Sequence, residues 1–598
     1  MVAASRTLSG SALAEAPGPR SLNEVGYSQV TLKSEPHLAQ RENTHAVLMG
    51  LSDDSLLMPF RKVAGQPAPG EDIGGWYGYR PDYNFHHDDA GLAPGATFGQ
   101  WISALARMHA ATGDAATRDK VLRLNRLYAQ TISTEFYRKS RFPAYTFDKL
   151  VCGLMDAHRL VGDPDAFSIL DRTTDAAAPA LPGHAVDREV AWRMGMDLSY
   201  LWDEGYTMPE NLYLVSAMGA GERYRTMAAA YLDDATYFDP LARGENVLSD
   251  KQAYSYVNAL CSAMQAYLVG GSGKHLLAAQ NGFDMLEQQS YATGGWGPDE
   301  TLRKPGLGEV YASLTKSHNS FETPCGGYAH MKLMRYLLRA TRDGRYGDSM
   351  ERVMYNTVLG ALPLQPDGRA FYSSDYNFEG RRIYSVHRWP CCSGTLPQVA
   401  ADYGINCYLR EPGAVWVNLY LPSVLRWSEG GAQLSLEQDG SYPASGEGQT
   451  GQVRLRVTVS KPALFTLRLR IPAWAAGARI AVNGKAVTLE TVTGFMSLRR
   501  TWRTGDLVEL ELPMRPRLEV LDAAHPEVAA LMAGPLVLFA LRTATPGVPQ
   551  PAVTRAQVLA ATRVNDKEWR VESSSGAVKL VPFTEVGDSP YSTYLKLS

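Results

Sequence analysis

Three cysteines and one glutamate are the residues of this chain whose types and spacing best suit chemistry. Cys391 and Cys392 are adjacent, and Cys325 follows three positions after Glu322. Adjacent cysteines rarely bond each other, because the ring that they would close is strained. Three sulfurs and one carboxylate match the ligand set of a closed tetrahedral zinc site. Spacing alone leaves an alternative open, in which the three cysteines are buried and inert.

The other polar motifs carry weaker signals. Residues 86–89 (His-His-Asp-Asp) resemble a metal cluster, but such groups on one flexible loop more often form a solvated turn. Arg381, Arg382 and Arg388 could bind an acidic sugar, or could equally pair with nearby carboxylates. The sequence contains no Walker loop, no dinucleotide-binding glycine pattern and no Gly-x-Ser-x-Gly elbow.

Composition and charge narrow the class of protein. Of the 598 residues, 45% are hydrophobic and 20% are charged, and the net charge is −3. This balance gives no electrostatic attraction to nucleic acid or to an anionic membrane, so neither is expected as a partner. No apolar run reaches the roughly 18 residues of a spanning helix. The six cysteines are too few for a disulfide-stapled chain of this length.

The first residues give a mixed signal about location. Residues 11–16 resemble the cleavage end of a secretory signal, yet the ten residues before them contain no apolar region. We therefore expect residues 1–30 to be a tail or a signal remnant. A periplasmic or secreted location is the first expectation and a cytoplasmic one is the alternative, while the oligomeric state is not indicated.

From about residue 90 to 410, apolar positions recur at helical spacing and glycines mark the helix ends. Residues 100–111 are apolar at 101, 102, 105 and 108, and Gly113 follows. Gly162, Gly271 and Gly344 predict similar helix ends. The first three glycines are 49 and 109 residues apart, which fits one and then two helical hairpins of about 50 residues. We predict an (α/α)₆ toroid over residues 31–410.

After about residue 410 the pattern changes to a period of two, which is typical of antiparallel strands. Residues 414–421, 452–459 and 464–471 alternate, and Val482-Asn483-Gly484-Lys485 predicts a tight hairpin. We predict a β-sandwich over residues 411–540 and a small β module over residues 541–598. The expected fold class is thus mainly α with β, a helical toroid followed by antiparallel β domains.

Glycine-rich aromatic loops interrupt the helical part at residues 74–79 and 293–300. In toroids, such loops gather at one mouth and form the binding pocket. Trp296 lies in the second loop, and its ring suits stacking on a sugar, although plain packing is an equally good reading.

Three motifs carry a family resemblance. They are Thr293-Gly294-Gly295 followed by Glu300, then Glu322-Thr323-Pro324-Cys325 followed by Tyr328 and Lys332, and finally Cys391-Cys392. With residues 99–105, 148–154 and 470–474, they resemble the β-L-arabinofuranosidases of glycoside hydrolase families 127 and 146, formerly a domain of unknown function. The resemblance spans roughly residues 70 to 540.

The resemblance implies a retaining exo-glycoside hydrolase that acts on β-L-arabinofuranoside-like sugars of plant polysaccharide or glycoprotein glycans. It also implies a Zn²⁺ cofactor with four ligands, Glu322, Cys325, Cys391 and Cys392. Cys391 is the implied nucleophile, and zinc would keep its thiol ionised. Glu300 matches the family's acid/base residue, with Glu309 as the runner-up because loop lengths differ.

The chain departs from the family pattern at several positions. Pro324 is inserted into the usual Glu-Thr-Cys motif, which could shift Cys325 by one position. Several family pocket histidines are absent, and the places of two are taken by Asp148 and Gln252. The reaction class therefore transfers better than the sugar. The expected substrate contacts are Asp148, Lys149, Glu210, Gln252, Trp296 and Tyr328.

Other functions stay open at this point. One is a glycosidase of the same fold for an acidic or branched pectic sugar, and another is a non-catalytic, zinc-containing carbohydrate-binding protein. A polysaccharide lyase or sugar epimerase would need a histidine or tyrosine base in place of the cysteine pair.

Overall fold

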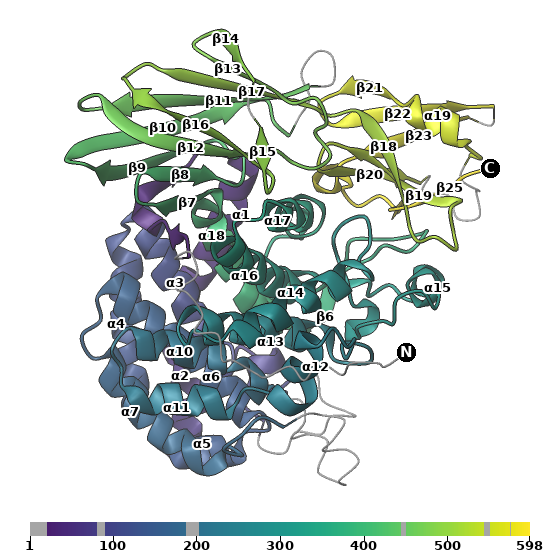
Figure 1. Cartoon of the computed structure of the whole chain (residues 1–598). Coiled ribbons are helices and arrows are strands. Elements are labelled where there is room, and N and C mark those ends of the chain that lie inside the picture. Colours follow the sequence, from purple (N-terminus) through teal and green to yellow (C-terminus); the bar gives the residue numbers. More distant parts are fainter. Residues whose placement is uncertain are drawn as a thin grey trace, which may run out of the picture.

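A computed structural model describes residues 21–598, apart from 81–89, 187–202, 444–449, 489, 543–550 and 575. The possible signal remnant at residues 11–16 and the His-His-Asp-Asp stretch at residues 86–89 lie outside the described residues. Figure 1 shows helices in the purple-to-teal half of the chain and strands in the green-to-yellow half.

The helical part is a ring of helices inside a second ring. The inner helices contact one another in a closed order, since the last returns to the first. They are α3 (Phe98–Thr112), α6 (Pro143–Asp156), α10 (Pro209–Ala217), α13 (Ala253–Leu268), α16 (Thr323–Thr341) and α18 (Cys392–Cys407). Each packs mainly against one outer helix. In the same order, the outer helices are α4 (Ala115–Tyr128), α7 (Ala166–Ala177), α11 (Glu222–Ala230), α14 (Gly273–Glu287), α17 (Arg345–Asn356) and α1 (Glu35–Gly50). The predicted helical toroid is confirmed.

The inner helices are buried on nearly every side. In α13 every residue from Ala253 to Ala266 is buried, and in α16 every residue from Thr323 to Leu338. A helix without a wet face belongs in the interior, so its polar side chains must meet partners inside the ring. Four further helices of the described residues lie outside the two rings: α2 (Asp53–Val63), α5 (Thr134–Lys139), α12 (Asp239–Ala242) and α15 (Glu309–Lys316).

Left-handed residues follow several of the helices, as the sequence predicts. Gly113 and Gly162 have φ of 75° and 72° and cap the ends of helical segments. The helix end expected at residues 342–344 is present, but Arg342 and not Gly344 is the left-handed residue that caps α16, with φ of 62°. Gly344 instead begins α17, where an added Cβ would lie 3.1 Å from the Cα of Gly494. Close backbone approach therefore explains this glycine.

Two antiparallel-rich sheets follow the ring and share its largest core cluster. One has the order β1 (Asn23–Glu24), β7 (Tyr408–Glu411), β8 (Ala414–Val417), β12 (Ala463–Arg470), β16 (Phe495–Trp502) and β15 (Thr491–Val492). The other has the order β14 (Lys485–Val487), β13 (Arg479–Val482), β17 (Leu507–Pro513), β11 (Thr450–Val459), β10 (Ala432–Gly440), β9 (Ser423–Glu429) and β2 (Val30–Leu32). The alternating burial of β11 matches the predicted period of two.

The chain before the helices contributes to both sheets. β1 pairs with β7, and β2 pairs with β9, in each case antiparallel. Residues 21–30, which the sequence suggested to be part of a tail, are therefore tied into the β domain. Strands of two or three residues are too short to show a periodic pattern.

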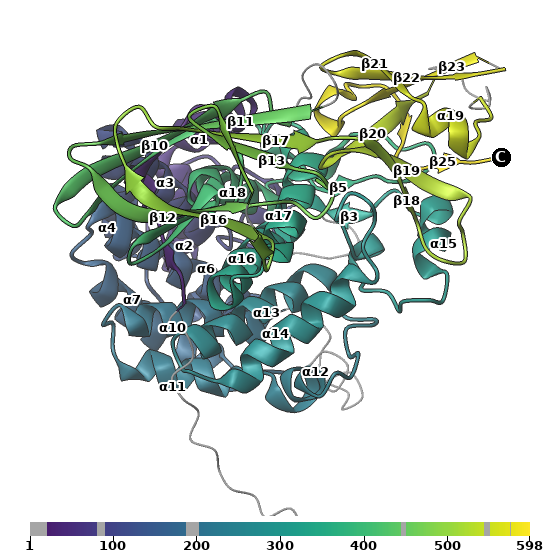
Figure 2. The ribbon, with the colours of Figure 1, turned by 45° about the horizontal axis from the view of Figure 1, so that its top comes forward.

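A third sheet begins at Pro516, before the residue 541 expected for the last module. Its order is β18 (Pro516–Val520), β19 (Val528–Ala533), β20 (Leu536–Leu541), β23 (Gly576–Val581), β22 (Glu568–Ser573) and β21 (Thr562–Asn565), and β24 (Tyr591–Ser592) and β25 (Leu595–Lys596) add to β20 and β19. It carries α19 (Arg555–Leu559) and a separate core cluster. Figure 2 shows α15 beside the β18–β19 connection, where Tyr311 stacks on His525.

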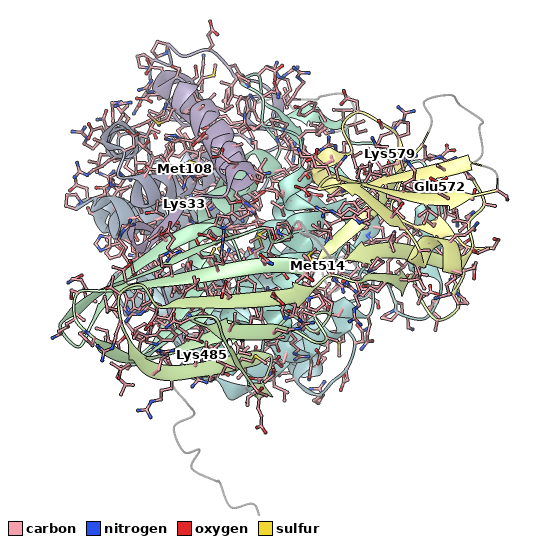
Figure 3. The ribbon with its side chains drawn as sticks, turned by 90° about the horizontal axis from the view of Figure 1, so that it is seen from above. Lys33, Met108, Lys485, Met514, Glu572 and Lys579 are labelled. Atoms are coloured by element: carbon pink, nitrogen blue, oxygen red, sulfur yellow. The ribbon has the colours of Figure 1, made fainter. Side chains whose placement is uncertain are left out.

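Figure 3 looks down on the two β regions. Lys485 lies on the sandwich, whereas Glu572 and Lys579 lie on the third sheet. Met514 is buried where the chain passes from one to the other. None of the described helices combines the length and the apolar character that a membrane span requires.

Candidate active site

The cysteine and glutamate side chains meet where two neighbouring inner helices begin. Glu322 ends the short strand β3 (Phe321–Glu322) and caps α16, and Cys325 lies in the first turn of that helix. Cys391 caps α18 and Cys392 is its first residue. Helix N-termini present a positive field, which favours anionic groups such as thiolates. Pro324 occupies the first turn of α16, a place where proline costs no hydrogen bond.

The four side chains fit a tetrahedral metal site. Their ligand atoms all lie within 4.8 Å of one another, and the cysteines form no disulfide. Cys325 Sγ lies 3.2 Å from Cys391 Sγ and 3.5 Å from Cys392 Sγ, and the last two lie 4.0 Å apart. Zinc bonds of about 2.3 Å at tetrahedral angles would place sulfurs about 3.8 Å apart. The inserted Pro324 therefore does not remove Cys325 from the group.

Electrostatics give a second argument for a cation in this cluster. Burial raises the pKa of Glu322, of Cys325 and of Cys392 well above their usual ranges. Hydrogen bonds with the Cys325 and Cys392 thiols lower the pKa of Cys391 instead. Without a cation, the cluster can hold one thiolate but not four negative charges, since buried like charges oppose ionisation. A bound divalent cation would remove this conflict.

Cys391 is more exposed to solvent than the other two cysteines. The residue is 8% exposed, whereas Cys325 and Cys392 are fully buried. The Oε1 atom of Glu322 lies 3.4 Å from Cys391 Sγ. Of the three sulfurs, Cys391 is therefore the one that an incoming ligand can reach first.

Glu300 faces this sulfur from a strained loop. It ends the single turn η7 (Pro298–Glu300) and has φ of 56°, next to Asp299 with φ of 54°. Two successive non-glycine residues in the left-handed region are uncommon, and such strain concentrates at functional sites. Burial raises the pKa of Glu300 and the Cys391 charge raises it further, although hydrogen bonds from Tyr372 and Gln252 oppose both. Glu300 is thus built to hold a proton near Cys391.

Glu309 has a different environment. It is the first residue of α15, and its carboxylate accepts a hydrogen bond from the backbone N–H of Lys304 at 3.2 Å in an exposed turn. α15 packs near the third sheet through Tyr311 and His525. This placement favours Glu300 over Glu309 as the proton donor.

Asp148 and Lys149 lie together on the inner helix α6. Lys149 Nζ lies 3.0 Å from Asp148 Oδ2, and Asn211 Nδ2 donates to Asp148 Oδ1 at 2.7 Å. Lys149 also lies over the ring of Tyr145, 4.4 Å from its centre. Burial disfavours the charge of Lys149, but Asp148 and Glu204 together raise its pKa, so the ammonium stays charged.

Glu210 is engaged inside the ring rather than free for a ligand. Its carboxylate accepts hydrogen bonds from Lys332 Nζ and from the Tyr336 hydroxyl, the latter at 2.8 Å. Lys332 lies 4.2 Å from the ring centre of Tyr328, whose hydroxyl accepts a bond from Gln398 at 3.2 Å. Glu210 and Tyr328 therefore belong to a buried polar network that spans α10 and α16.

Gln252 and Trp296 differ in how they fit their expected roles. Gln252 caps α13 and its Nε2 donates to Glu300 Oε2 at 3.3 Å, so it orients the candidate acid. Trp296 is only 1% exposed, donates to His330 at 3.2 Å and packs edge-on against Phe321. A ring with this burial has no free face for a sugar, so we correct its expected stacking role to one in core packing.

The arginines near the cysteines form local bonds. Arg382 donates to the carbonyls of Gly360 and Gly587, at 3.0 and 2.9 Å. Arg388 donates to the carbonyl of Asp367. Arg382 and Arg388 are thus used on backbone carbonyls, which is neither the expected pairing with carboxylates nor recognition of an acidic sugar.

Sequence reasoning missed several tyrosines around the cluster. Tyr372 forms hydrogen bonds with both Glu300 and Cys391, and so joins the candidate acid to the candidate nucleophile. The Cys391 charge also reaches Tyr145, and the Cys325 charge reaches Tyr254. They come from separate segments of the chain, and no local motif marks them.

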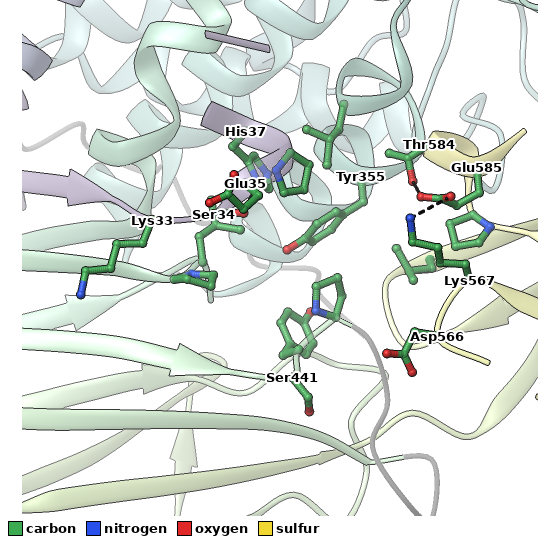
Figure 4. Close-up of a pocket in the computed structure, with 18 residues that line it drawn as sticks. Lys33, Ser34, Glu35, His37, Tyr355, Ser441, Asp566, Lys567, Thr584 and Glu585 are labelled. Carbon is green, nitrogen blue, oxygen red and sulfur yellow. Dashed lines mark hydrogen bonds and ion pairs between the residues drawn. The ribbon is translucent and has the colours of Figure 1, made fainter. Parts of the chain in front are cut away.

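A cavity of about 380 Å³ lies elsewhere, between the start of α1, the sandwich and the third sheet. Figure 4 shows His37 and Tyr355 on one side and Asp566, Lys567 and Glu585 on the other. None of the cluster residues lines it, so its size does not make it the site of the chemistry.

Comparison with known families defines the class of protein. Residues 29–404 match the model described as "Beta-L-arabinofuranosidase, GH127 catalytic domain", and residues 414–514 match the GH127 middle domain. The protein is therefore an enzyme of the glycoside hydrolase class, and its substrate is a carbohydrate. More narrowly, the chain belongs to the GH127 beta-L-arabinofuranosidase family, as the motifs around Glu322 and Cys391 indicated.

Solved structures agree with this assignment at the level of the fold. A GH127 beta-L-arabinofuranosidase from Geobacillus stearothermophilus T6 is 19% identical, with a TM-score of 0.71 over 95% of this chain and 100% of that chain. A second GH127 beta-arabinofuranosidase is 18% identical, with a TM-score of 0.71 over 96% of this chain and 98% of that chain. A search of curated proteins found no match.

Proposed function

We propose that this enzyme is a retaining exo-glycosidase that removes β-L-arabinofuranose-like units, with Cys391 as nucleophile and Glu300 as acid/base. The observation that carries the proposal is the buried set of three sulfurs and one carboxylate, with Cys391 as its most accessible sulfur and Glu300 within reach of its charge. Membership in the GH127 family supports the same reaction class.

The four clustered residues would hold a zinc ion, because the ligand types and spacings fit one. When bound, zinc would supply the positive charge that keeps the thiols ionised in a buried site. Everything else in the mechanism is done by side chains of the chain itself.

In the first step, the Cys391 thiolate attacks the anomeric carbon of the sugar and forms a carbon–sulfur bond. The bond from that carbon to the leaving oxygen breaks, and Glu300 gives its proton to this oxygen. Its raised pKa makes Glu300 ready for that role, since a carboxyl group must hold its proton until the leaving group takes it.

In the second step, Glu300 takes a proton from water while the water oxygen attacks the anomeric carbon. The carbon–sulfur bond breaks, and Cys391 leaves as a thiolate. Two displacements at one carbon return the original configuration, so the product retains the stereochemistry of the substrate. Gln252 and Tyr372, which bond Glu300, would keep its carboxyl group oriented during both steps.

A neutral sugar fits the surroundings better than an acidic one. Arg382 and Arg388 are used on backbone carbonyls, and the ionised group of the cluster is the Cys391 thiolate. A carboxylated substrate would bring a further negative charge beside this thiolate in a buried site. We therefore favour a neutral arabinofuranoside over an acidic pectic sugar.

The test compares the parent enzyme with Cys391→Ser on a panel of 4-nitrophenyl glycosides, with zinc and a mild reductant present. We expect the parent to cleave the β-L-arabinofuranoside, and Cys391→Ser to lose at least about a thousandfold in kcat. Product NMR at early times should show the β-anomer first. Equal turnover by Cys391→Ser would reject the nucleophile, and binding of sugar without turnover in the parent would indicate a non-catalytic protein.

A further inference from the structure

Glu204 occupies a fixed and strained position beside the candidate site. It precedes the single turn η5 (Gly205–Thr207) and has φ of 53° and ψ of 31°, the left-handed region that non-glycine residues rarely adopt. Its carbonyl oxygen accepts hydrogen bonds from the backbone N–H and the hydroxyl of Thr207, both at 2.9 Å. These bonds hold the backbone in this conformation.

Bonds to two inner helices fix where Glu204 lies. Asp203, its neighbour, accepts from the backbone N–H groups of Ala144 and Tyr145 at 2.9 Å each, which ties this turn to the start of α6. Ser262 on α13 donates to the carbonyl of Thr207 at 3.0 Å. Glu204 is thus held between α6, which carries Lys149, and α13, which itself packs against the Cys325 helix α16.

The side chain of Glu204 has hydrogen-bonding capacity that the described part of the protein does not use. It is partly exposed, yet its Oε2 atom is buried and finds no hydrogen-bond partner among the described residues. The buried hydroxyl of Tyr254 is likewise unpartnered within the described part of the chain. The charge of Glu204 acts on Tyr254, so the two groups belong to one region. Buried polar atoms normally have partners, and two unpaired ones in one region point to a missing ligand.

Glu204 is not required as a counter-ion either. Lys149 already has a partner in Asp148 at 3.0 Å, and Asp148 is held by Asn211. Burial raises the pKa of Glu204 to about 8, Lys149 opposes this, and the Cys391 charge adds to it. The last influence means that Glu204 is within range of the reactive sulfur, and Glu204 does not share the Gln252 and Tyr372 partners of Glu300.

We propose that Glu204, together with Tyr254, binds ring hydroxyl groups of the sugar whose anomeric carbon faces Cys391, and thereby determines which sugar is accepted. This inference rests on the proposed function. A protonated carboxyl group can donate a hydrogen bond to one hydroxyl and accept one from another, and Lys149 and Tyr254 can donate to the hydroxyl oxygens. The ligand class is a neutral polyhydroxylated ring, and a sugar that carries its own carboxylate is disfavoured.

The first test uses Glu204→Gln and deoxy substrates. For the best 4-nitrophenyl glycoside of the parent enzyme, we expect kcat/KM to fall about tenfold to a hundredfold, the usual effect of leaving a buried hydrogen-bonding group unsatisfied. For the analogue that lacks the bound hydroxyl, the same substitution should change kcat/KM less than about threefold. Tyr254→Phe should show the same selectivity for one hydroxyl. The control Glu222→Gln, an exposed carboxylate on α11, should match the parent.

The inference is overturned if Glu204→Gln retains the parent kcat/KM, or if its loss is equal for every deoxy analogue. If the enzyme cleaves another neutral glycoside but not arabinofuranosides, the proposed substrate is rejected. The effect of Glu204→Gln is then measured on that glycoside and its deoxy analogues. Calorimetric titration with free L-arabinose provides a readout without turnover. We expect at least tenfold weaker binding by Glu204→Gln, whereas equal affinity, or no binding by the parent, would contradict the inference.

Discussion

The Sγ atoms of Cys325 and Cys391 lie 3.2 Å apart although 66 positions separate them in the chain. The toroid creates this closeness, because α16 and α18 are neighbours in the inner ring and the side chains come from their first turns. Both helix N-termini therefore point at one buried site, where their fields favour negative charge.

The first prediction concerns the metal. The purified enzyme should contain about one zinc per chain, because three thiols and a carboxylate at these spacings form a closed site. Cys392→Ser should lower the zinc content severalfold and reduce the unfolding temperature, since metal binding to the native state contributes to stability. Elemental analysis and calorimetry measure both quantities.

Cys261→Ser is the matched control for this experiment. Cys261 is also fully buried in the helical ring, but it bonds the carbonyl of Ala329 at 3.6 Å and is not in the cluster. We expect its zinc content to equal that of the parent. Full zinc content in Cys392→Ser would show that the cluster is not the metal site.

The second prediction concerns the proton donor. Glu300→Gln cannot protonate the leaving oxygen, so kcat/KM should fall by about 10² to 10⁴ for substrates with an alkyl leaving group. The loss should be much smaller for 4-nitrophenyl glycosides, because 4-nitrophenolate leaves with little help. Initial rates over a series of leaving groups give the dependence directly.

Glu309→Gln serves as the control for Glu300→Gln. Its carboxylate bonds a backbone N–H in an exposed turn at the start of α15, so the leaving-group dependence should match that of the parent. If the two variants exchanged these behaviours, Glu309 would be the acid.

The sequence predicted those site residues that a short motif or the residue type itself marks, and it missed those that only the fold brings to the site. Cysteine chemistry is visible in the residue types alone, so Cys325, Cys391 and Cys392 could be grouped before any fold was known. The sequence does not tell whether a tryptophan faces a pocket or a core, and Trp296 proved to be in the core. Glu204 carries no motif, because its role depends on a left-handed turn and on contacts with two distant helices.

For the fold, too, the sequence predicted the elements that have a pattern of their own and missed those that are too short to have one. Helices of ten or more residues show their period, and the toroid followed from their spacing and glycine ends. The strands β1 and β2 contain only two and three residues, and no pattern could reveal their pairing with β7 and β9.

The third prediction concerns the junction between the ring and the sandwich. Arg470, on β12, is fully buried, lies 3.0 Å from Glu351 of α17 and donates to the carbonyl of Asn418 at 2.6 Å. Arg470→Met would leave the Glu351 carboxylate buried without its cation, a change that typically costs about 3–5 kcal/mol. We expect a clear decrease in the urea midpoint of unfolding.

Two companion variants test this explanation. Arg470→Met combined with Glu351→Gln should recover part of the loss, because the unpaired charge is then gone. Arg479→Met removes an arginine of β13 whose side chain is 82% exposed, and it should leave the midpoint nearly unchanged. Equal effects of Arg470→Met and Arg479→Met would mean that the buried ion pair does not stabilise the junction.

The last prediction concerns pH and the N-terminal strand β1. Although burial opposes ionisation of Glu24, Arg339 at 2.8 Å and Arg335 at 3.3 Å lower its pKa from 4.5 to about 2. A carboxyl group with a lowered native pKa stabilises the fold fully above its unfolded pKa, and this contribution is lost as the pH falls from about 4.5 towards 2. Because the side chain is 24% exposed, solvent screening reduces the expected contribution to about 2 kcal/mol.

Glu24→Gln should therefore lower the free energy of unfolding at pH 7, and the difference from the parent should shrink steadily below about pH 4.5. Urea unfolding of both proteins between pH 7 and pH 3 measures this difference. The exposed Glu71 provides the control, since Glu71→Gln should give no such trend. A difference between Glu24→Gln and the parent that stayed constant with pH would show that Glu24 acts through packing and not through its charge.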